Sequence, residues 1–301
     1  MSELVDIGEL LARHREGKGW RALARAITVV ENTPPWDVES PDVERPVYTI
    51  GFTGPPGAGK STLVGRMIEA YSEAGARVGV VAIDPSSPIS GGAVLGDRVR
   101  MEAHLEREGV YVRSLASRGS HGALASCARN VARMLEASGS FDVILIETVG
   151  AGQTEVAIAG LADTVVLVTV PGLGDAVQTI KAGLVELADI VVVNMADRPG
   201  VAETMRHFRL TLGHDVDVLK TTAIEGEGVS ELRQNLEARW TRFVESGELV
   251  GRRREKELAE ATLVAEEWVR ACAKNGEGQS AHTMSEAVRV ILEEAATTWR
   301  R

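Results

Sequence analysis

The sequence has few cysteines, no long apolar run and no signal-like beginning, and each of these features excludes a class of protein. Its 301 residues include two cysteines, Cys127 and Cys272, which lie far apart and match no metal-ligand spacing. We therefore expect a reduced, cytoplasmic chain without disulfides. No apolar run approaches the roughly 18 residues needed to span a bilayer. Residues 1–17 are mixed in charge and lack the apolar core of a signal peptide, so we expect no membrane insertion.

The chain also lacks an excess of positive charge and a cluster of metal-binding side chains. It has 33 Lys and Arg against 43 Asp and Glu, a net charge of -10. This balance gives no general attraction for nucleic acid or an anionic membrane, so neither is expected as a partner. Six scattered histidines and two isolated cysteines provide no Cys/His cluster of the kind that a nickel, cobalt or zinc carrier needs.

What the sequence does contain is a phosphate-binding loop. Residues 51–63 read GFTGPPGAGKSTL and include the G-x-x-x-x-G-K-S spacing of a P-loop. A β-branched apolar run at 47–50 precedes the loop and helical periodicity follows it, which is the order that the motif requires. Backbone N–H groups and the helix dipole would then bind phosphate, with Lys60 at the terminal phosphates and the Ser61 hydroxyl on Mg²⁺. The expected phosphate-binding residues are Gly57, Ala58, Gly59, Lys60, Ser61 and Thr62.

Two aspartates follow the P-loop region at places where a metal site could form. Residues 77–83 predict a second buried strand that ends at Asp84. Strand, helix and strand in this order give a right-handed parallel unit, which carries Asp84 to the same edge as the P-loop. Asp97 follows a loop rich in Ser, Pro and Gly and begins a charged helix. Its spacing alone allows either a helix N-cap or a site residue at the end of a switch loop.

The most apolar strand, at 141–146, ends in Glu147. A carboxylate after such a strand is what the second half of a P-loop site needs, because Mg²⁺ bound to phosphates recruits an acidic residue directly or through water. Gly150 would offer its N–H to the γ-phosphate, in a segment that becomes ordered when that phosphate is present. The alternative is an ordinary buried strand that ends in a turn.

Three further positions have two interpretations each. His121 lies in a glycine-flanked loop, where it either meets a phosphate or a partner or is simply exposed. Gln178 and Lys181 follow a predicted strand at 163–170 and share one helical face, because they are three residues apart. They form either a further nucleotide-sensing element or a solvated surface.

The predicted strand that ends at Asn194 carries a guanine signal. Guanine-specific P-loop proteins end this strand in Asn, Lys, any residue, Asp, and the Asp accepts from guanine donors that adenine lacks. Asp197 fits this role and Asn194 fits the role of bracing the loop, whereas Met195 replaces the Lys. Met keeps the apolar cover over the base and loses the charge, so we expect guanine preference with weaker affinity. Thr222 and Ala223 match the last base-contacting loop.

The segments outside this core are predicted to be helical. Two short helices lie between residues 4 and 32, a linker rich in Pro, Asp and Glu runs to residue 46, and amphipathic helices cover 229–245, 248–274 and 281–298. The amphipathic helices either pack back on the nucleotide domain or join a second subunit. We expect an α/β P-loop NTPase with a mostly parallel central sheet flanked by helices. The expected division is a helical extension and linker at 1–45, a GTPase domain at 46–235 and a helical dimerisation extension at 236–301.

Several strings occur together in a distinctive order. They are GFTGPPGAGKSTL, AIDPSSPISGG, LGDRVRM, SRGSHG, ETVGAGQTE, VPGLGDAVQTIKAG and VVNMADRPG. Between about residues 20 and 235 the chain resembles the MeaB/ArgK family of P-loop GTPases, the bacterial relatives of the human methylmalonic aciduria type A protein. Two positions depart from that family, since Met195 stands where most members have Lys and His121 where Leu is usual.

The resemblance implies a homodimeric GTPase that binds GTP or GDP with Mg²⁺ and dimerises through its C-terminal helices. Its implied partner is an adenosylcobalamin-dependent acyl-CoA mutase, whose cofactor loading it gates. The resemblance places Asp84, Asp97 and Glu147 around Mg²⁺ and the attacking water, and so favours the site role for Asp97. It places Gln178 and Lys181 in a third switch.

Three other functions are compatible with a P-loop. They are a metallochaperone GTPase, a small-molecule kinase that phosphorylates a bound substrate, and a scaffold that binds nucleotide without turnover. The missing Cys/His cluster argues against the first, and phosphate release without an added acceptor would separate the other two from a GTPase.

Overall fold

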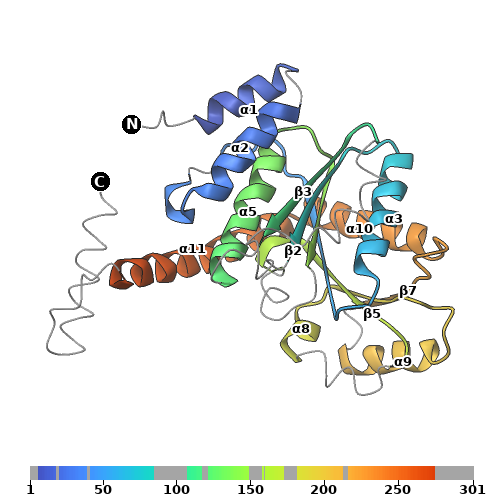
Figure 1. The fold of residues 1–301 in the computed structure, drawn as a ribbon. Helices are drawn as coiled ribbons and strands as arrows, with labels where there is room; N and C mark the ends of the chain where they lie inside the picture. Colours follow the sequence, from blue (N-terminus) through green and yellow to red (C-terminus); the bar gives the residue numbers. More distant parts are fainter. Residues whose placement is uncertain are drawn as a thin grey trace, which may run out of the picture.

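A parallel β-sheet forms the centre of the computed structural model (Figure 1). The structure describes residues 6–17, 20–38, 41–84, 107–116, 121–148, 158, 160–172, 182–212 and 216–274. Within these residues, seven strands pair in parallel in the order β3-β2-β4-β1-β5-β6-β7. Their bounds are β1 Tyr48–Thr53, β2 Val78–Asp84, β3 Val110–Ala116, β4 Val143–Thr148, β5 Thr164–Thr169, β6 Ile190–Val193 and β7 Asp217–Lys220. The expected α/β class with a mostly parallel sheet is confirmed.

Helices cover both faces of the sheet, as buried strands without polar alternation require. Their bounds are α1 Ile7–Arg15, α2 Trp20–Asn32, α3 Lys60–Glu73, α5 His121–Ala137, α8 Ala182–Glu186, α9 Val201–Leu212, α10 Val229–Ser246 and α11 Glu248–Lys274, with a short 3₁₀ turn η1 at Pro35–Asp37. Helices α3 and α10 share one apolar cluster with the sheet, and α2 and α5 share another. The predicted N-terminal helices and the first two C-terminal ones are therefore present, whereas the one expected at 281–298 lies outside the described residues.

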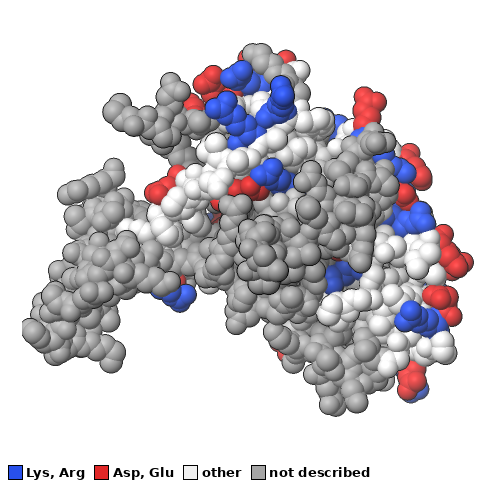
Figure 2. Space-filling model, viewed as in Figure 1, with Lys and Arg blue, Asp and Glu red and all other residues white. Residues whose placement is uncertain are grey.

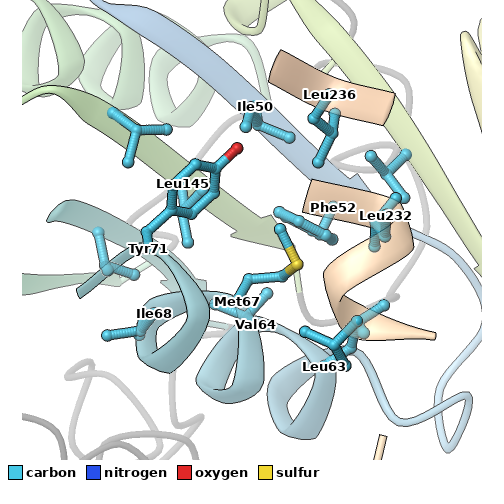
Figure 3. Packing of buried hydrophobic residues seen from close by; sticks show 14 of the residues in the cluster. Ile50, Phe52, Leu63, Val64, Met67, Ile68, Tyr71, Leu145, Leu232 and Leu236 are labelled. Carbon is cyan, nitrogen blue, oxygen red and sulfur yellow. The ribbon is translucent and has the colours of Figure 1, made fainter. Parts of the chain in front are cut away.

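The helix after the P-loop is anchored by apolar packing. Leu63 and Met67 of α3 are fully buried against Phe52 of β1, and Leu232 of α10 packs into the same cluster (Figure 3). Burying one such side chain stabilises the fold by about 1.5–3 kcal/mol. The start of α3 is thus held against β1 and α10 by several of these contacts, which fixes the place of the loop between β1 and α3.

The N-terminal helices pack on α5. Leu23 and Ile27 of α2 are fully buried in the cluster that includes Val131 and Leu135 of α5. Figure 2 shows Lys and Arg side chains gathered over these helices with some Asp and Glu side chains beside them, and both signs of charge elsewhere on the described part of this face. No helix among the described residues has both the length and the apolar character needed to cross a membrane.

Aspartates that precede strands tie neighbouring strands together. Asp163 lies just before β5, and its carboxylate accepts from the backbone N–H of Thr49 in β1 at 3.0 Å. Asp189 lies just before β6, and its carboxylate accepts from the N–H of Val165 in β5 at 2.8 Å. Each carboxylate thus satisfies a donor at the N-terminal edge of the sheet, where the parallel hydrogen-bond pattern begins.

Helix α11 binds these same aspartates. Arg253 donates to both carboxylate oxygens of Asp163, at 2.9 and 2.8 Å, and Arg252 donates to Asp189 at 3.0 Å. Burial alone would lower the pKa of Arg253, but its hydrogen bonds and charge interactions with Asp163 and Glu136 together outweigh burial, so the net shift of the pKa is upward. Lys256 donates to Ala162 O. Burial lowers the pKa of Lys256 to about 8 against the opposing charge of Asp163. The first half of α11 is therefore part of the support of the sheet.

Replacing Asp163 should destabilise the whole fold. In Asp163→Ala, the buried N–H of Thr49 and the guanidinium of Arg253 both lose an acceptor, so we expect the free energy of unfolding to fall by about 3 kcal/mol. Urea denaturation followed by circular dichroism measures this change. Glu237→Gln is the control, because the Arg233–Glu237 pair has a carboxylate side chain that is 45% exposed, and its loss should cost less than about 1 kcal/mol. Equal losses of unfolding free energy in Asp163→Ala and Glu237→Gln would show that Asp163 does not hold the strands together at this edge.

Candidate functional site

The P-loop connects β1 to α3 at the C-terminal edge of the sheet. Its backbone turns through left-handed conformations at Gly57 and Gly59, with φ of 78° and 83°. A Cβ on Gly54 would overlap Val168 O, and a Cβ on Gly59 would overlap the Asn194 side-chain amide. Glycine is required at these two positions because other parts of the protein approach the loop closely.

The P-loop lysine lies inside the loop. Lys60 is 5% exposed, and its ammonium donates to Gly54 O at 2.7 Å and to Pro55 O at 3.0 Å. The ammonium is therefore already placed among the backbone groups of the loop. A phosphate bound there would meet this charge together with the N-terminal dipole of α3, which begins at Lys60 itself.

Strand β4 brings a carboxylate to the start of α3. Glu147 pairs in register with Phe52 of β1 and is 1% exposed. Its Oε1 accepts from the Ser61 hydroxyl at 2.6 Å. Asp84 ends β2, which pairs with β4, so its backbone lies at the same edge. A hydroxyl and carboxylates at the phosphate end of a P-loop are the oxygen ligands that suit Mg²⁺, so these residues fit that ion.

A single amide organises the other end of the site. Asn194 follows β6 and is 2% exposed. Its Nδ2 donates to Ala58 O of the P-loop at 2.9 Å. Its Oδ1 accepts from the Thr221 hydroxyl at 3.0 Å and from the Ala223 N–H at 3.1 Å. The P-loop, the end of β6 and the loop after β7 are therefore joined through one side chain.

The residues after Asn194 turn sharply. Met195 has φ of 56°, the one positive value among the non-glycine residues that the structure describes. Its Cε lies 3.8 Å from the position that a Cβ on Gly59 would take, so the side chain covers the P-loop glycine. Asp197 is exposed just beyond this turn. Its carboxylate is thus accessible to a ligand on the side of the P-loop opposite Glu147.

A comparison with protein families decides what this site belongs to. The model for "Methylmalonyl Co-A mutase-associated GTPase MeaB" matches residues 23–277. The chain belongs to this family. The match runs through α11, beyond residue 235 at which the resemblance in the sequence ends. Membership, a P-loop at the sheet edge and the parallel sheet together identify a P-loop GTPase.

Individual MeaB relatives agree with this assignment. A putative GTPase of Pyrococcus horikoshii is 45% identical over 267 residues, which cover 82% of each chain. The methylmalonic aciduria type A homolog of mouse mitochondria is 35% identical over 266 residues, covering 78% of this chain and 64% of that protein. The crystal structure titled LAO/AO transport system kinase superposes with a TM-score of 0.66 at 23% identity and full coverage of both chains, which shows the same fold.

Most of the residues expected at the MeaB site are brought to one edge of the sheet, and the others lie outside the described part. Thr62 is exposed in the first turn of α3, and Thr222 and Ala223 are buried beside Asn194. His121 begins α5. The expected positions outside the described residues are Asp97, Gly150, Gln178 and Lys181, and the side chain of Asp84 is likewise not described.

Two residues at the MeaB site were not expected from the sequence. Thr221 donates to Asn194, and Arg66 of α3 donates to Ala223 O at 3.0 Å. Neither stands in a spacing motif. Thr221 lies directly before Thr222 and Ala223, which match the last base-contacting loop, and this signal places it at the functional edge, whereas Arg66 has no such signal.

Removing the Asn194 amide should loosen the nucleotide edge. Asn194→Ala leaves Ala58 O, the Thr221 hydroxyl and the buried Ala223 N–H without their partner, so we expect a loss of about 2–4 kcal/mol in unfolding free energy. Guanine nucleotide affinity should fall in parallel. Urea titration and calorimetric GDP binding measure the two effects. Thr221→Val removes one donor only and should cost about 1 kcal/mol. If Asn194→Ala and Thr221→Val lose the same small amount of unfolding free energy, the Asn194 amide does not organise this edge of the sheet.

Proposed function

We propose that this MeaB-family GTPase hydrolyses GTP with Mg²⁺ in the cytoplasm and serves as a chaperone for an adenosylcobalamin-dependent acyl-CoA mutase. The observation that carries the proposal is the convergence of two half-sites on one sheet edge. The Ser61–Glu147 pair lies at the phosphate end, and Asn194 braces the loop at the base end. The family's own description and the printed name of the mouse relative support the link to methylmalonyl-CoA mutase.

In the proposed reaction, water attacks the γ-phosphorus while the bond to the β–γ bridging oxygen breaks, so that GDP and phosphate leave. Mg²⁺, when bound, would neutralise charge on the phosphate oxygens, and Ser61, Asp84, Asp97 and Glu147 are the residues proposed to hold it or its water. Lys60 would stabilise charge that develops on the terminal phosphates. The loop N–H groups of Gly57, Ala58, Gly59 and Thr62 would hold the phosphates in line, with Gly150 at the γ-phosphate. The protein thus contributes positioning and charge rather than covalent chemistry.

The proposed base contacts follow from the Asn194 cluster. The Asp197 carboxylate would accept from guanine N1 and N2, and the loop at Thr222 and Ala223 would face the base. Adenine offers no donors at these two positions, so the arrangement favours GTP over ATP. Asn194 acts through these groups by holding the loop.

The proposed quaternary structure is a homodimer through the C-terminal helices. Leu258 and Leu263 on α11 are 64% and 47% exposed. Apolar side chains on a helix whose first half is pinned to the sheet support a contact with a second copy. The division into an extension at 1–45, a GTPase domain at 46–235 and a dimerisation extension at 236–301 is part of this proposal.

The direct test of the phosphate site is the variant Lys60→Ala. In Lys60→Ala the phosphates lose the buried ammonium, and we expect steady-state phosphate release from GTP to fall by at least about 100-fold. A malachite-green assay with purified protein and no added acceptor measures it. Lys220→Ala removes an exposed lysine of β7 and should retain activity. Full turnover in Lys60→Ala would contradict the site, and GDP formation that requires an added acceptor and leaves no free phosphate would favour a small-molecule kinase.

The partner is tested separately. A tagged full-length chain, expressed in its native cell, should co-purify with a cobalamin-dependent mutase, and the recovery should differ between GDP and a non-hydrolysable GTP analogue. Lys60→Ala is the control, because it should lose the nucleotide dependence. Mass spectrometry identifies the captured proteins. Capture of a nickel or cobalt enzyme with no mutase would favour the metallochaperone function instead.

A further inference from the structure

Arg66 of helix α3 donates hydrogen bonds to the loop that follows β7. The Nε of Arg66 donates to Ala223 O at 3.0 Å, and its Nη2 donates to Ile224 O. Its Nη1 donates to Glu69 Oε2 at 2.8 Å. Three nitrogens of one planar guanidinium are thus used, two of them on consecutive carbonyl groups. Lysine could not reproduce this forked geometry, because its ammonium is a point charge.

Arg66 binds Ala223, which Asn194 already holds from the opposite side. Ala223 is 2% exposed, and its N–H donates to Asn194 Oδ1 at 3.1 Å. Its carbonyl accepts from Arg66 and, at 3.3 Å, from the N–H of Gly226 within the turn. The adjoining Ile224 is 72% exposed. The loop is therefore held from the β6 side by Asn194 and from the α3 side by Arg66, in addition to the burial of Ala223 in the apolar cluster of α3 and α10.

We propose that Arg66 is a positioning residue for base recognition. It ties the loop that faces the base to the same helix whose N-terminus holds the phosphates, so the two halves of the site keep a fixed separation. This inference rests on the proposed function, since the loop must receive a guanine base. Preorganising the loop removes part of the ordering cost of binding.

If Arg66 only stabilised the fold, its loss would lower the free energy of unfolding more than the affinity for the base. Apolar contacts of Leu63, Met67 and Leu232 already join α3 to α10. The Arg66 side chain is 38% exposed, so its ion pair with Glu69 contributes little to stability. Loss of Arg66 should therefore affect binding of the base more than folding or binding of phosphate.

The test uses the full-length chain with Arg66→Ala, Arg66→Lys and the control Glu69→Gln. Calorimetry measures dissociation constants for GDP, ADP and inorganic tripolyphosphate, and urea titration measures stability. We expect Arg66→Ala to weaken GDP binding about tenfold and to leave tripolyphosphate binding within about twofold. Arg66→Lys should recover part of the GDP affinity. Glu69→Gln should keep it, because both carbonyl contacts of Arg66 remain.

The possible results separate this inference from the proposed function. Unchanged GDP affinity in Arg66→Ala, or equal losses for GDP and tripolyphosphate, would overturn the positioning role. A wild-type protein that binds ADP as tightly as GDP would contradict guanine recognition instead. In that case the comparison of either nucleotide with tripolyphosphate still decides whether Arg66 positions the base loop.

Discussion

The hydrogen bonds of the Asn194 side chain are the constraint on which the nucleotide edge depends. One amide donates to the P-loop at Ala58 and accepts from Thr221 and Ala223. This use of both ends of the amide requires asparagine, because a carboxylate lacks the donor and leucine lacks both groups. It also requires Gly59, since a Cβ there would occupy the space of the amide. Three segments that are distant in the sequence thus restrict one another's residues, and the site is specified as a unit.

The opposite edge of the sheet has a comparable network built from charge. Asp163 links β1 to the start of β5, and Asp189 links β5 to the start of β6. Arg253 and Arg252 of α11 bind these two carboxylates. Because β1 leads to the P-loop and β6 leads to Asn194, fixing the beginnings of these strands also fixes the separation of the two half-sites at their ends. Helix α11 therefore contributes to the geometry of the site from the opposite edge of the sheet.

Most of the fold and part of the site were predictable from the sequence, because they depend on residue patterns within short segments. Apolar β-branched runs predicted the strands, and the P-loop spacing with its flanking strand and helix predicted the parallel edge at which Glu147 and Asn194 both lie. What could not be predicted depends on close approach between segments far apart in the chain. Arg66 has the spacing of an ordinary surface residue on a helix, and its role exists only because the loop after β7 lies beside it. Asp163 likewise resembles a common turn residue before a strand, since no local pattern shows that α11 returns to bind it.

Met195 stands where the resemblance to the MeaB/ArgK family leads us to expect Lys, and its side chain covers Gly59 of the P-loop. Its left-handed backbone is costly for a residue with a Cβ and is disfavoured most for β-branched side chains. Methionine and lysine share an unbranched stem, so either can follow the same path over Gly59. Met195 therefore keeps the apolar cover over Gly59, whereas a lysine at this position would also add a positive charge. Selection of the base would depend on the donors and acceptors of Asp197 and the Ala223 loop, which Met195 does not supply. The physical consequence of Met195 is thus expected in the strength of nucleotide binding rather than in the identity of the base.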